Sequence, residues 1–333
     1  MTASQPNLWA DRNVFVTGCT GLLGSWIVGA LVESGANVVA LIRDTVPSSR
    51  LVTTGMIGRI NVVHGQVEDY SVLERTLNEY QVQSVFHLAA QTIVGIANQS
   101  PLSTFEANIR GTWNLLEACR RTDWVSEVVV ASSDKAYGEN EQLPYGEDTP
   151  LVGTHPYDVS KSCADLLAQA YASTYQLPVC ITRFGNLFGP GDFNFNRLIP
   201  GTIRSIVRNE APVIRSNGEY SRDYIYVEDA ARAYMLLAEK MAADSKVHGN
   251  AFNFSYGSPL TARGVVDKIL AQMERNDLEP IVLDAAPNEI PHQYLHPSRA
   301  KQMLGWQPEF NFDRGLAKTI PWYQDSLQGK DTS

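Results

Sequence analysis

The glycine-rich segment Thr17–Gly24, with the sequence TGCTGLLG, places the strongest constraint on the fold of this 333-residue chain. It directly follows a short, mostly apolar segment, Val14–Thr17, and opens a helical pattern over Leu22–Glu33. A strand that leads into a helix through closely spaced glycines brings the backbone near a pyrophosphate, whose charge the free amides of the first helical turn can bind. The segment therefore predicts a strand–turn–helix unit that binds a dinucleotide.

Each glycine of this segment has a separate task in such a turn. Gly18 permits the tight turn, Gly21 lets the backbone approach the pyrophosphate, and Gly24 lets the helix pack closely on the strand. We expect these residues of the turn to contact the dinucleotide: Gly18, Thr20, Gly21, Leu22, Leu23 and Gly24.

Short Val- and Ile-rich segments alternate with helical patterns through the first half of the chain, which is typical of a parallel sheet with crossover helices. The expected strands are Val14–Thr17, Val38–Ile42, Asn61–His64, Val85–Leu88, Val128–Ala131 and Val179–Thr182. The expected helices are Leu22–Glu33, Val72–Glu79, Pro101–Arg121 and Tyr157–Tyr175. This order predicts an α/β fold with a doubly wound parallel sheet of the Rossmann type.

From about Gly185 the pattern changes to shorter segments that are richer in Gly, Pro, Asn and Arg. The elements expected here are helices over Leu198–Arg208, Glu228–Met241 and Thr261–Met273 and strands over Ala251–Phe254 and Pro280–Leu283. We therefore expect a dinucleotide-binding domain over residues 1–184, which also holds the catalytic residues, and a smaller C-terminal substrate-binding lobe over 185–333. Whether the chain crosses from this lobe back to the sheet is left open.

The end of the second strand bears on which dinucleotide binds. An acidic residue at the strand tip would bind the ribose diol of NAD, but the tip residue here is Ile42. Arg43 would suit the 2′-phosphate of NADP, and Asp44 comes after it. NAD is the expected cofactor, and Arg43 leaves NADP open. Further cofactor contacts are expected from residues that follow other strands: Gln66, Val67, Ala89 and Ala90.

A second group of residues follows the fifth expected strand. Ser133 lies just beyond this strand, at the sheet edge where ligands bind in such folds. Tyr157 and Lys161 are four residues apart and share one helix face, where the ammonium can lower the pKa of the phenol. We expect Ser133 to orient a substrate hydroxyl toward Tyr157, Tyr157 to act as the base, and Lys161 to hold the nicotinamide ribose.

At these residues the chain resembles the extended short-chain dehydrogenase/reductase superfamily, which includes the nucleotide-sugar epimerases and dehydratases. Four other segments carry the same resemblance: His87–Ala90, TFEANIRGT with Asn108, Arg183–Asn186 and Arg222–Asp229. The resemblance implies an NAD-dependent enzyme that acts on a nucleotide-diphosphate sugar, with Asn108 among the residues near the cofactor.

The pair Asp134–Lys135 bears on the reaction type. Eliminating water from a hexose needs an acid for the leaving hydroxyl and a base for the proton at C5, whereas epimerases of this superfamily carry small, non-acidic residues here. Asp-Lys resembles the CDP-glucose 4,6-dehydratase subgroup, although His155 and the segment SRDYIYVED depart from that subgroup. The leading expectation is a 4,6-dehydratase acting on CDP-glucose. A C4 epimerase that uses the same Ser133, Tyr157 and Lys161 stays open.

The resemblance also implies which residues face the sugar nucleotide. Guanidinium groups suit the two phosphate charges of such a substrate better than lysine does. Together with Ser133, the residues expected to bind the substrate are Gln91, Asn186, Arg197, Leu198, Arg215 and Arg222.

Composition excludes other partners and sites. A net charge of -9 argues against nucleic acid or an anionic membrane as partner, because both require a basic face. No apolar stretch approaches the ~20 residues of a membrane span, and the N-terminus lacks a targeting pattern, so a cytoplasmic location is expected. No metal site is expected, because His292 and His296 lie in a Pro-rich segment without a third ligand nearby.

The resemblance finally implies a homodimer in which Pro101–Arg121 and Tyr157–Tyr175 of each subunit form a four-helix bundle. Apolar residues at three- and four-residue spacing support this expectation. They are Ile109, Trp113 and Leu116 on the first helix and Ala164, Leu167, Ala168, Tyr171 and Tyr175 on the second.

Overall fold

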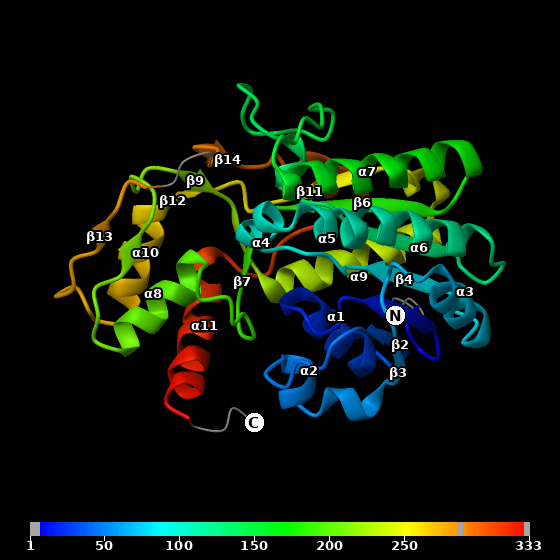
Figure 1. The fold of residues 1–333 in the computed structure, drawn as a ribbon, viewed down its shortest axis with the longest axis horizontal. Helices are drawn as coiled ribbons and strands as arrows, with labels where there is room; N and C mark the ends of the chain where they lie inside the picture. Colours follow the sequence, from blue (N-terminus) through cyan, green and yellow to red (C-terminus); the bar gives the residue numbers. More distant parts are fainter. Residues whose placement is uncertain (1–6, 286–288, 330–333) are drawn as a thin grey trace, which may run out of the picture.

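A parallel β-sheet forms the centre of the molecule (Figure 1). The computed structural model describes residues 7–285 and 289–329. Within these residues the sheet has seven strands in the order β3-β2-β1-β4-β5-β6-β11. They are β1 (Asn13–Thr17), β2 (Asn37–Ile42), β3 (Asn61–His64), β4 (Ser84–His87), β5 (Glu127–Ala131), β6 (Val179–Phe184) and β11 (Ala251–Phe254). The predicted doubly wound Rossmann sheet is therefore confirmed.

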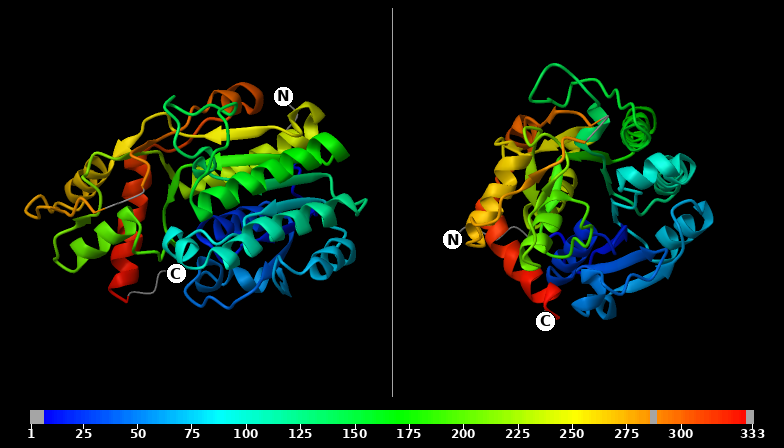
Figure 2. Two further views of the ribbon diagram at one scale, coloured as in Figure 1. Left: turned by 45° about the horizontal axis from the view of Figure 1, so that its top comes forward. Right: turned by 60° about the vertical axis from the view of Figure 1, so that its left-hand side comes forward.

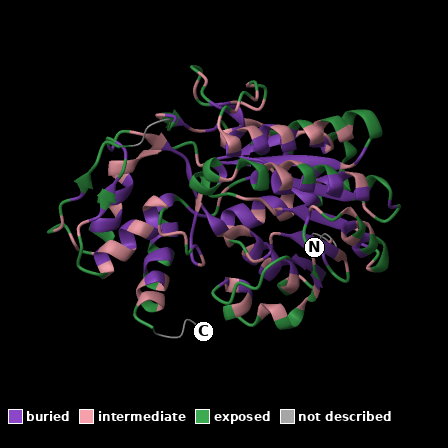
Figure 3. Ribbon diagram, viewed as in Figure 1, coloured by how far each residue is buried: buried purple, intermediate pink, exposed green. Residues whose placement is uncertain are grey.

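Helices cover both faces of the sheet (Figures 1 and 2). Alternate side chains of each strand point to opposite faces, so Val14 and Val16 join the hydrophobic cluster under one layer and Phe15 joins the other. The first layer contains α1 (Leu22–Glu33) and α9 (Val227–Ala243), and the second contains α3 (Tyr70–Glu79), α6 (Gly111–Arg120) and α7 (Pro156–Tyr175). Figure 3 shows the central strands of the sheet largely buried, whereas Asn61 and His64 of the edge strand β3 are exposed.

Two segments beyond residue 185 return to the sheet. Strand β11 pairs in parallel with β6, with Ala251 opposite Ile181, and so becomes the seventh strand. Helix α9 packs against α1, and its Ala230, Ala233 and Leu237 belong to the same buried cluster as the sheet. The sheet and its helices are thus built from both halves of the sequence.

The helix expected over Pro101–Arg121 is divided into three parts. These are α5 (Pro101–Phe105), a π-helical segment Glu106–Arg110 and α6. A π turn is not visible in a hydrophobic pattern, and such turns are frequent at functional sites. The turn contains Asn108, which is buried.

Part of the apolar face expected between subunits lies in the chain's own core. Leu116, Ala164 and Ala168 are almost fully buried within the described chain, and Leu116 and Ala168 pack in the cluster beneath the sheet. The reason is that α6 and α7 must first cover the sheet. The outward residues of these helices include Trp113 and Leu166, which are 43% and 52% exposed.

The remaining C-terminal segments form a smaller lobe beside the carboxyl ends of the strands (left in Figure 1). Its main elements are α8 (Leu198–Val207), α10 (Ala262–Gln272), α11 (Phe312–Leu327), β7 (Asn186–Phe188), β8 (Val213–Ile214), β9 (Ser221–Arg222), β10 (Tyr224–Tyr226), β12 (Leu260–Thr261), β13 (Ile281–Val282) and β14 (His292–Gln293). Helix α11, which contains Pro321, is absent from the elements expected from sequence. The three helices pack around one hydrophobic cluster that includes Ile203, Val266 and Leu316.

Short helical segments connect these elements. They are α2 (Arg50–Thr53), α4 (Val94–Gln99) and the 3-10 or π segments η1 (Met56–Arg59), η3 (Asp134–Tyr137), η4 (Ser245–Val247) and η5 (Ala300–Leu304). Segment η3 follows β5 directly and carries the residues that sequence reasoning placed at the catalytic edge. No helix in the described parts of the chain is long and apolar enough to cross a membrane.

Candidate active site

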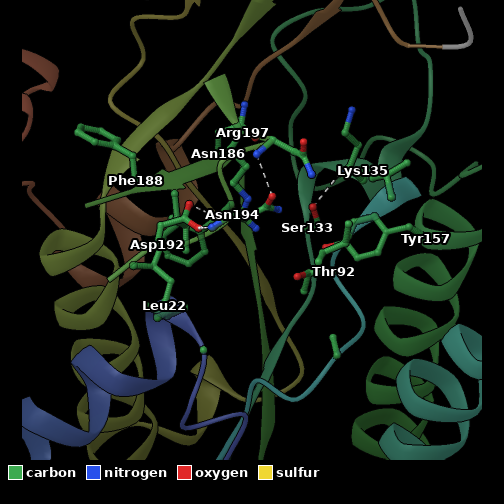
Figure 4. Close-up of a pocket in the computed structure, with 18 of the residues that line it drawn as sticks. Leu22, Thr92, Ser133, Lys135, Tyr157, Asn186, Phe188, Asp192, Asn194 and Arg197 are labelled. Atoms are coloured by element: carbon green, nitrogen blue, oxygen red, sulfur yellow. Dashed lines mark hydrogen bonds and ion pairs between the residues drawn. The ribbon is translucent and has the colours of Figure 1, made fainter. Parts of the chain in front are cut away.

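A cleft with a volume of about 1210 Å³ lies between the carboxyl edge of the sheet and the lobe. The predicted residues that line it are Gly18, Thr20, Gly21, Leu22, Leu23, Gly24, Arg43, Gln66, Val67, Ala89, Ala90, Ser133, Asp134, Lys135, Tyr157, Lys161, Asn186, Arg197, Leu198, Arg215 and Arg222. Figure 4 shows Ser133 and Tyr157 across the cleft from Asn186 and Arg197. The structure thus gathers residues that lie more than half the chain apart, from Gly18 to Arg222.

The glycine turn leaves no space for a side chain at Gly18 or Gly24, but it leaves space at Gly21. A Cβ atom at Gly24 would lie 2.2 Å from the carbonyl oxygen of Gly18, and one at Gly18 would lie 2.6 Å from the amide of Ala89. At Gly21 a Cβ would meet only the oxygen of Gly18, at 3.3 Å, and would otherwise enter the cleft. Helix α1 has no side-chain cap and no acidic residue in its first turn. The turn therefore fits a pyrophosphate.

Buried polar atoms without partners mark the length of the cleft. Glu68 Oε2, Ser132 Oγ and Thr202 Oγ1 are buried and form no hydrogen bond within the described residues, and all three residues line the cleft. They follow β3, follow β5 and lie on α8, respectively. Because buried polar atoms are nearly always hydrogen-bonded, the wall fits a long polar ligand that spans sheet and lobe.

Arg43 and Asp44 lie together at the outer end of the cleft. The Arg43 Nε–H donates to Asp44 Oδ2 at 2.6 Å, and both side chains are exposed. The Arg43 guanidinium, because of which NADP was kept as a possible cofactor, thus already pairs with a carboxylate of the chain.

Ser133 connects the catalytic groups. Its hydroxyl lies 3.0 Å from Asp134 Oδ1, and its oxygen accepts a hydrogen bond from the Lys135 amide at 3.2 Å. Burial raises the pKa of the Tyr157 phenol to about 12, although a hydrogen bond with Ser133 and the charge of Arg197 oppose the rise. Ser133 therefore joins Tyr157 to the acid that follows it in sequence.

Lys161, which the sequence predicted to lower the pKa of Tyr157, is not among the main groups that act on that pKa. Its Nζ donates to the backbone oxygen of Ala131 at 2.8 Å, and burial lowers the pKa of the ammonium to about 8. Burial of the phenol is the larger effect on Tyr157. The shared helix face indicated proximity correctly, but it could not show that both groups would be buried.

Asp134 and Lys135 face the same cleft with opposite pKa shifts. Burial raises the pKa of Asp134 and lowers that of Lys135, while the attraction between the two charges opposes both shifts. Burial therefore favours a protonated acid beside a neutral amine, the forms that donate and accept protons in an elimination. The backbone oxygen of Asp134 also accepts a hydrogen bond from Gln293 Nε2 at 3.0 Å.

Two residues that were predicted to contact the cofactor or the substrate, Asn108 and Gln91, do not line the cleft. Asn108 Oδ1 accepts from the Gln91 amide at 2.7 Å, and its Nδ2 donates to Gln91 O at 3.0 Å and to Ser160 Oγ at 2.9 Å. Asn108 is thus a brace between the loop after β4 and helix α7, because its polar atoms are all used within the chain. The Gln91 side chain accepts from the Ile93 amide at 3.0 Å.

The arginines of the lobe differ in how firmly the chain holds them. Arg222 is buried, donates to Pro291 O at 2.9 Å and to Ile290 O, and pairs with Glu289 at 3.0 Å. Arg197 and Arg215 are less constrained: among residues 7–285 and 289–329 each donates a single side-chain hydrogen bond, to Asp192 and Asn196 respectively, both at 3.0 Å. Arg222 therefore holds its own loop, whereas Arg197 and Arg215 keep donors directed at the cleft available.

Sequence reasoning did not assign His155 and Asp158, which also line the cleft. His155 is the N-cap residue of α7, and Asp158 lies beside Tyr157 in its first turn. Asp158 was visible between Tyr157 and Lys161 in the sequence. However, nothing local shows that the third residue of this helix faces the cleft.

Within residues 7–285 and 289–329, no group of three or more His, Cys, Asp or Glu side chains is arranged to hold a metal ion. His292 Nδ1 instead lies 2.9 Å from Ser221 Oγ. The four cysteines are free thiols, three of them buried.

The 3-2-1-4-5-6 sheet, its glycine turn and the buried Ser133, Tyr157 and Lys161 define a Rossmann-fold protein of the short-chain dehydrogenase/reductase type. More particularly, the chain belongs to the GDP-mannose 4,6 dehydratase family, whose model matches residues 15–319. Proteins of this kind are nucleotide-sugar dehydratases and epimerases, and the protein is accordingly an enzyme.

Known relatives cover almost the whole chain. The CDP-glucose 4,6-dehydratase of Salmonella typhimurium is 32% identical over 98% of this chain and 94% of its own length. A dTDP-glucose 4,6-dehydratase structure from Streptomyces venezuelae, with NAD and TYD bound, has a TM-score of 0.85 at 26% identity, with 96% and 99% of the two chains covered. A UDP-glucose 4-epimerase structure from Thermotoga maritima has a TM-score of 0.86 at 28% identity, with 95% and 100% covered.

Proposed function

We propose that this protein is a nucleotide-sugar 4,6-dehydratase that converts an NDP-hexose, with CDP-glucose favoured, into the NDP-4-keto-6-deoxyhexose. The observation that carries the proposal is the acid–amine pair of Asp134 and Lys135, which lines the cleft next to Ser133 and Tyr157. The family match and the full-length similarity to a CDP-glucose 4,6-dehydratase support the same activity.

NAD is the cofactor of the proposed reaction; when bound, it would supply the hydride acceptor for oxidation at C4 and the hydride donor for reduction at C6. The glycine turn around Gly21 would hold the pyrophosphate, and Lys161 would hold the nicotinamide ribose. Related dehydratase structures contain NAD. The ion pair of Arg43 with Asp44 also supports NAD over NADP, because the guanidinium that would bind a 2′-phosphate is already partnered.

Tyr157 and Ser133 carry the first proton transfer. The Tyr157 phenolate takes the proton of the C4 hydroxyl, while Ser133 holds that hydroxyl in place. Because burial raises the pKa of Tyr157 to about 12, the phenol needs positive charge nearby to ionise. Arg197 across the cleft already opposes the rise, and the oxidised nicotinamide of a bound NAD would add a second positive charge.

Asp134 and Lys135 carry the elimination. The 4-keto group acidifies the proton at C5, and the neutral amine of Lys135 takes it. Asp134 then donates its proton to the departing C6 hydroxyl, so that water leaves and a C5–C6 double bond forms. Burial of both groups favours the protonation states that this step requires.

The decisive experiment is incubation of the purified protein with NAD and a panel of NDP-hexoses. A 4-keto-6-deoxy product, detected by its ultraviolet absorbance in alkali and by mass loss of one water, is expected, with CDP-glucose turned over fastest. A C4 epimer as the sole product would exclude the dehydratase.

A C4 epimerase is the second candidate, favoured by the structural similarity to UDP-glucose 4-epimerase. The variant Asp134→Asn separates the two activities. A dehydratase should stop after the first hydride transfer and accumulate reduced cofactor, because the leaving hydroxyl loses its acid. An epimerase should keep most of its activity, since it eliminates no water.

We further propose a homodimer in the cytoplasm. The outward faces of α5–α6 and α7 carry exposed apolar residues, including Leu102 at 72% and Leu166 at 52% exposure, which support a four-helix bundle between two copies. Free thiols at all four cysteines support a reducing compartment.

A further inference from the structure

Asp158 is the buried carboxylate of the cleft that the reaction above leaves unused. It is 4% exposed and lines the cleft, yet within the described residues its side chain forms no hydrogen bond or ion pair. Its carboxylate oxygens are not among the fully buried side-chain atoms of the described residues that lack a partner, so they reach the cleft, where a charge can act on the reacting groups.

Asp158 is held against the segment that carries Lys135. The Ser162 hydroxyl lies 2.9 Å from Ala136 O in η3 and 3.1 Å from Asp158 O in α7, so one side chain joins the two segments. A Cβ at Gly153 would lie 2.7 Å from the same Asp158 oxygen, so the backbone of Gly153 packs closely against this first turn of α7. Asp158 and Lys135 therefore occupy fixed places on one wall.

Electrostatics couple the two side chains. The charges that act on Asp158 come from Lys135 and His155, which favour the carboxylate, and from Asp134, which opposes it; burial raises its pKa. Those that act on Lys135 come from Asp134, Asp158 and Glu289, which favour the ammonium, and from Arg222, which opposes it. Lys135 forms no ion pair within the described residues, so its amine remains directed at the cleft.

We propose that Asp158 is a positioning residue that stabilises the ammonium formed on Lys135 when Lys135 takes the C5 proton. This inference rests on the proposed dehydratase function. In the step concerned the C5–H bond breaks, its electron pair enters the enolate of the 4-keto group, and its proton converts the Lys135 amine to an ammonium. In the proposed sequence of steps Asp134 keeps its proton until the C6 hydroxyl leaves. Lys135 and His155 favour the carboxylate form of Asp158, so this carboxylate can balance the new charge on Lys135.

The experiment compares wild type with Asp158→Asn, using CDP-glucose with hydrogen or deuterium at C5. Single-turnover absorbance of the reduced nicotinamide measures C4 oxidation, and formation of the 4-keto-6-deoxy product measures the later steps. We expect the variant to slow product formation by roughly 10- to 100-fold, less than loss of a complete acid–base group, with C4 oxidation within about two-fold of wild type. The isotope effect from C5 should increase, and Asp158→Glu should restore part of the rate.

The ratio of the two rates is measured in one preparation, so partial unfolding of the variant lowers both rates and leaves their ratio unchanged. Asp267→Asn serves as the matched control, because it removes a half-exposed carboxylate from α10. An unchanged rate ratio and isotope effect in Asp158→Asn would overturn the inference alone. A wild-type enzyme that forms no 4-keto-6-deoxy product would overturn the proposed function and the inference with it.

Discussion

At the scale of single residues, motifs with fixed local spacing could be predicted and partners from distant segments could not. Tyr157 and Lys161 could be predicted as a pair from their spacing of one helical turn, and the structure places both in the cleft. Asn108, expected near the cofactor, does not line the cleft, and its partners Gln91 and Ser160, which come from two other segments, could not be predicted from local spacing. The role of each lining residue stays a prediction until it is tested by substitution.

Asp223 provides a test of buried charge at this scale. The side chain is 1% exposed and accepts a hydrogen bond from the Leu295 amide at 2.6 Å, and burial raises its pKa from 3.8 to about 6. The folded chain thus binds this proton more tightly than the unfolded chain. The stability contributed by the group is complete below pH 4 and is lost as the pH rises through about 6.

Asp223→Asn should remove this pH dependence while keeping an oxygen that accepts from Leu295. We expect the variant and wild type to unfold alike near pH 4, and the variant to be more stable at pH 7 by up to about 3 kcal/mol. Thermal or urea unfolding across this pH range measures the difference. A variant that is less stable than wild type at pH 7 would contradict the expectation.

At the scale of elements, buried parallel strands were predicted within one or two residues at most ends, because such strands are short Val- and Ile-rich runs. The π turn at Glu106–Arg110 was not predicted, since one extra residue in a helical turn hardly changes the apolar pattern. The two-residue strands of the lobe were mostly missed for a related reason. They are too short to show an alternation.

The glycine turn allows a matched pair of substitutions at this scale. Gly24→Ala places a Cβ 2.2 Å from a backbone oxygen, so we expect a loss of about 2–3 kcal/mol in the free energy of unfolding. Gly21→Ala meets only one atom at 3.3 Å and should fold, but its methyl group stands where the pyrophosphate would lie. Its affinity for NAD should fall at least about tenfold, a cost of about 1.4 kcal/mol.

Urea unfolding and NAD titration by fluorescence, applied to both variants, separate the two effects. Wild-type NAD affinity in a folded Gly21→Ala protein would show that the pyrophosphate does not bind at this turn.

At the scale of the whole molecule, the order of strands followed from the alternation of elements, whereas the return of the chain to the sheet did not. Strand β11 and helix α9 resemble other lobe segments in sequence, and only long-range pairing with β6 and α1 assigns them to the sheet. Local patterns carry no information on such pairing.

The proposed dimer is tested at this scale by placing charges on the outward helix faces. Trp113→Glu and Leu166→Glu should convert a species of two chains into one of a single chain in light scattering, because a buried charge without a partner destabilises an interface. Trp124→Glu is the matched control, since Trp124 is 48% exposed but lies in the loop after α6. Dissociation by the control alone, or a wild-type monomer with full activity, would contradict the bundle.

One short strand has a consequence for how the enzyme selects its substrate. Strand β14 pairs with β9, which ends at Arg222, and its Gln293 donates to the backbone of Asp134. Arg222, which is expected to bind the sugar nucleotide, and Asp134, the proposed acid, therefore share a support. Binding energy from the nucleotide would then raise the rate of turnover rather than the affinity. Glucose 1-phosphate, which lacks the nucleotide, should then show a kcat for elimination at least about tenfold below that of the full substrate, even at saturation. Equal kcat values for glucose 1-phosphate and the full substrate would show that strand β14 does not couple nucleotide binding to elimination.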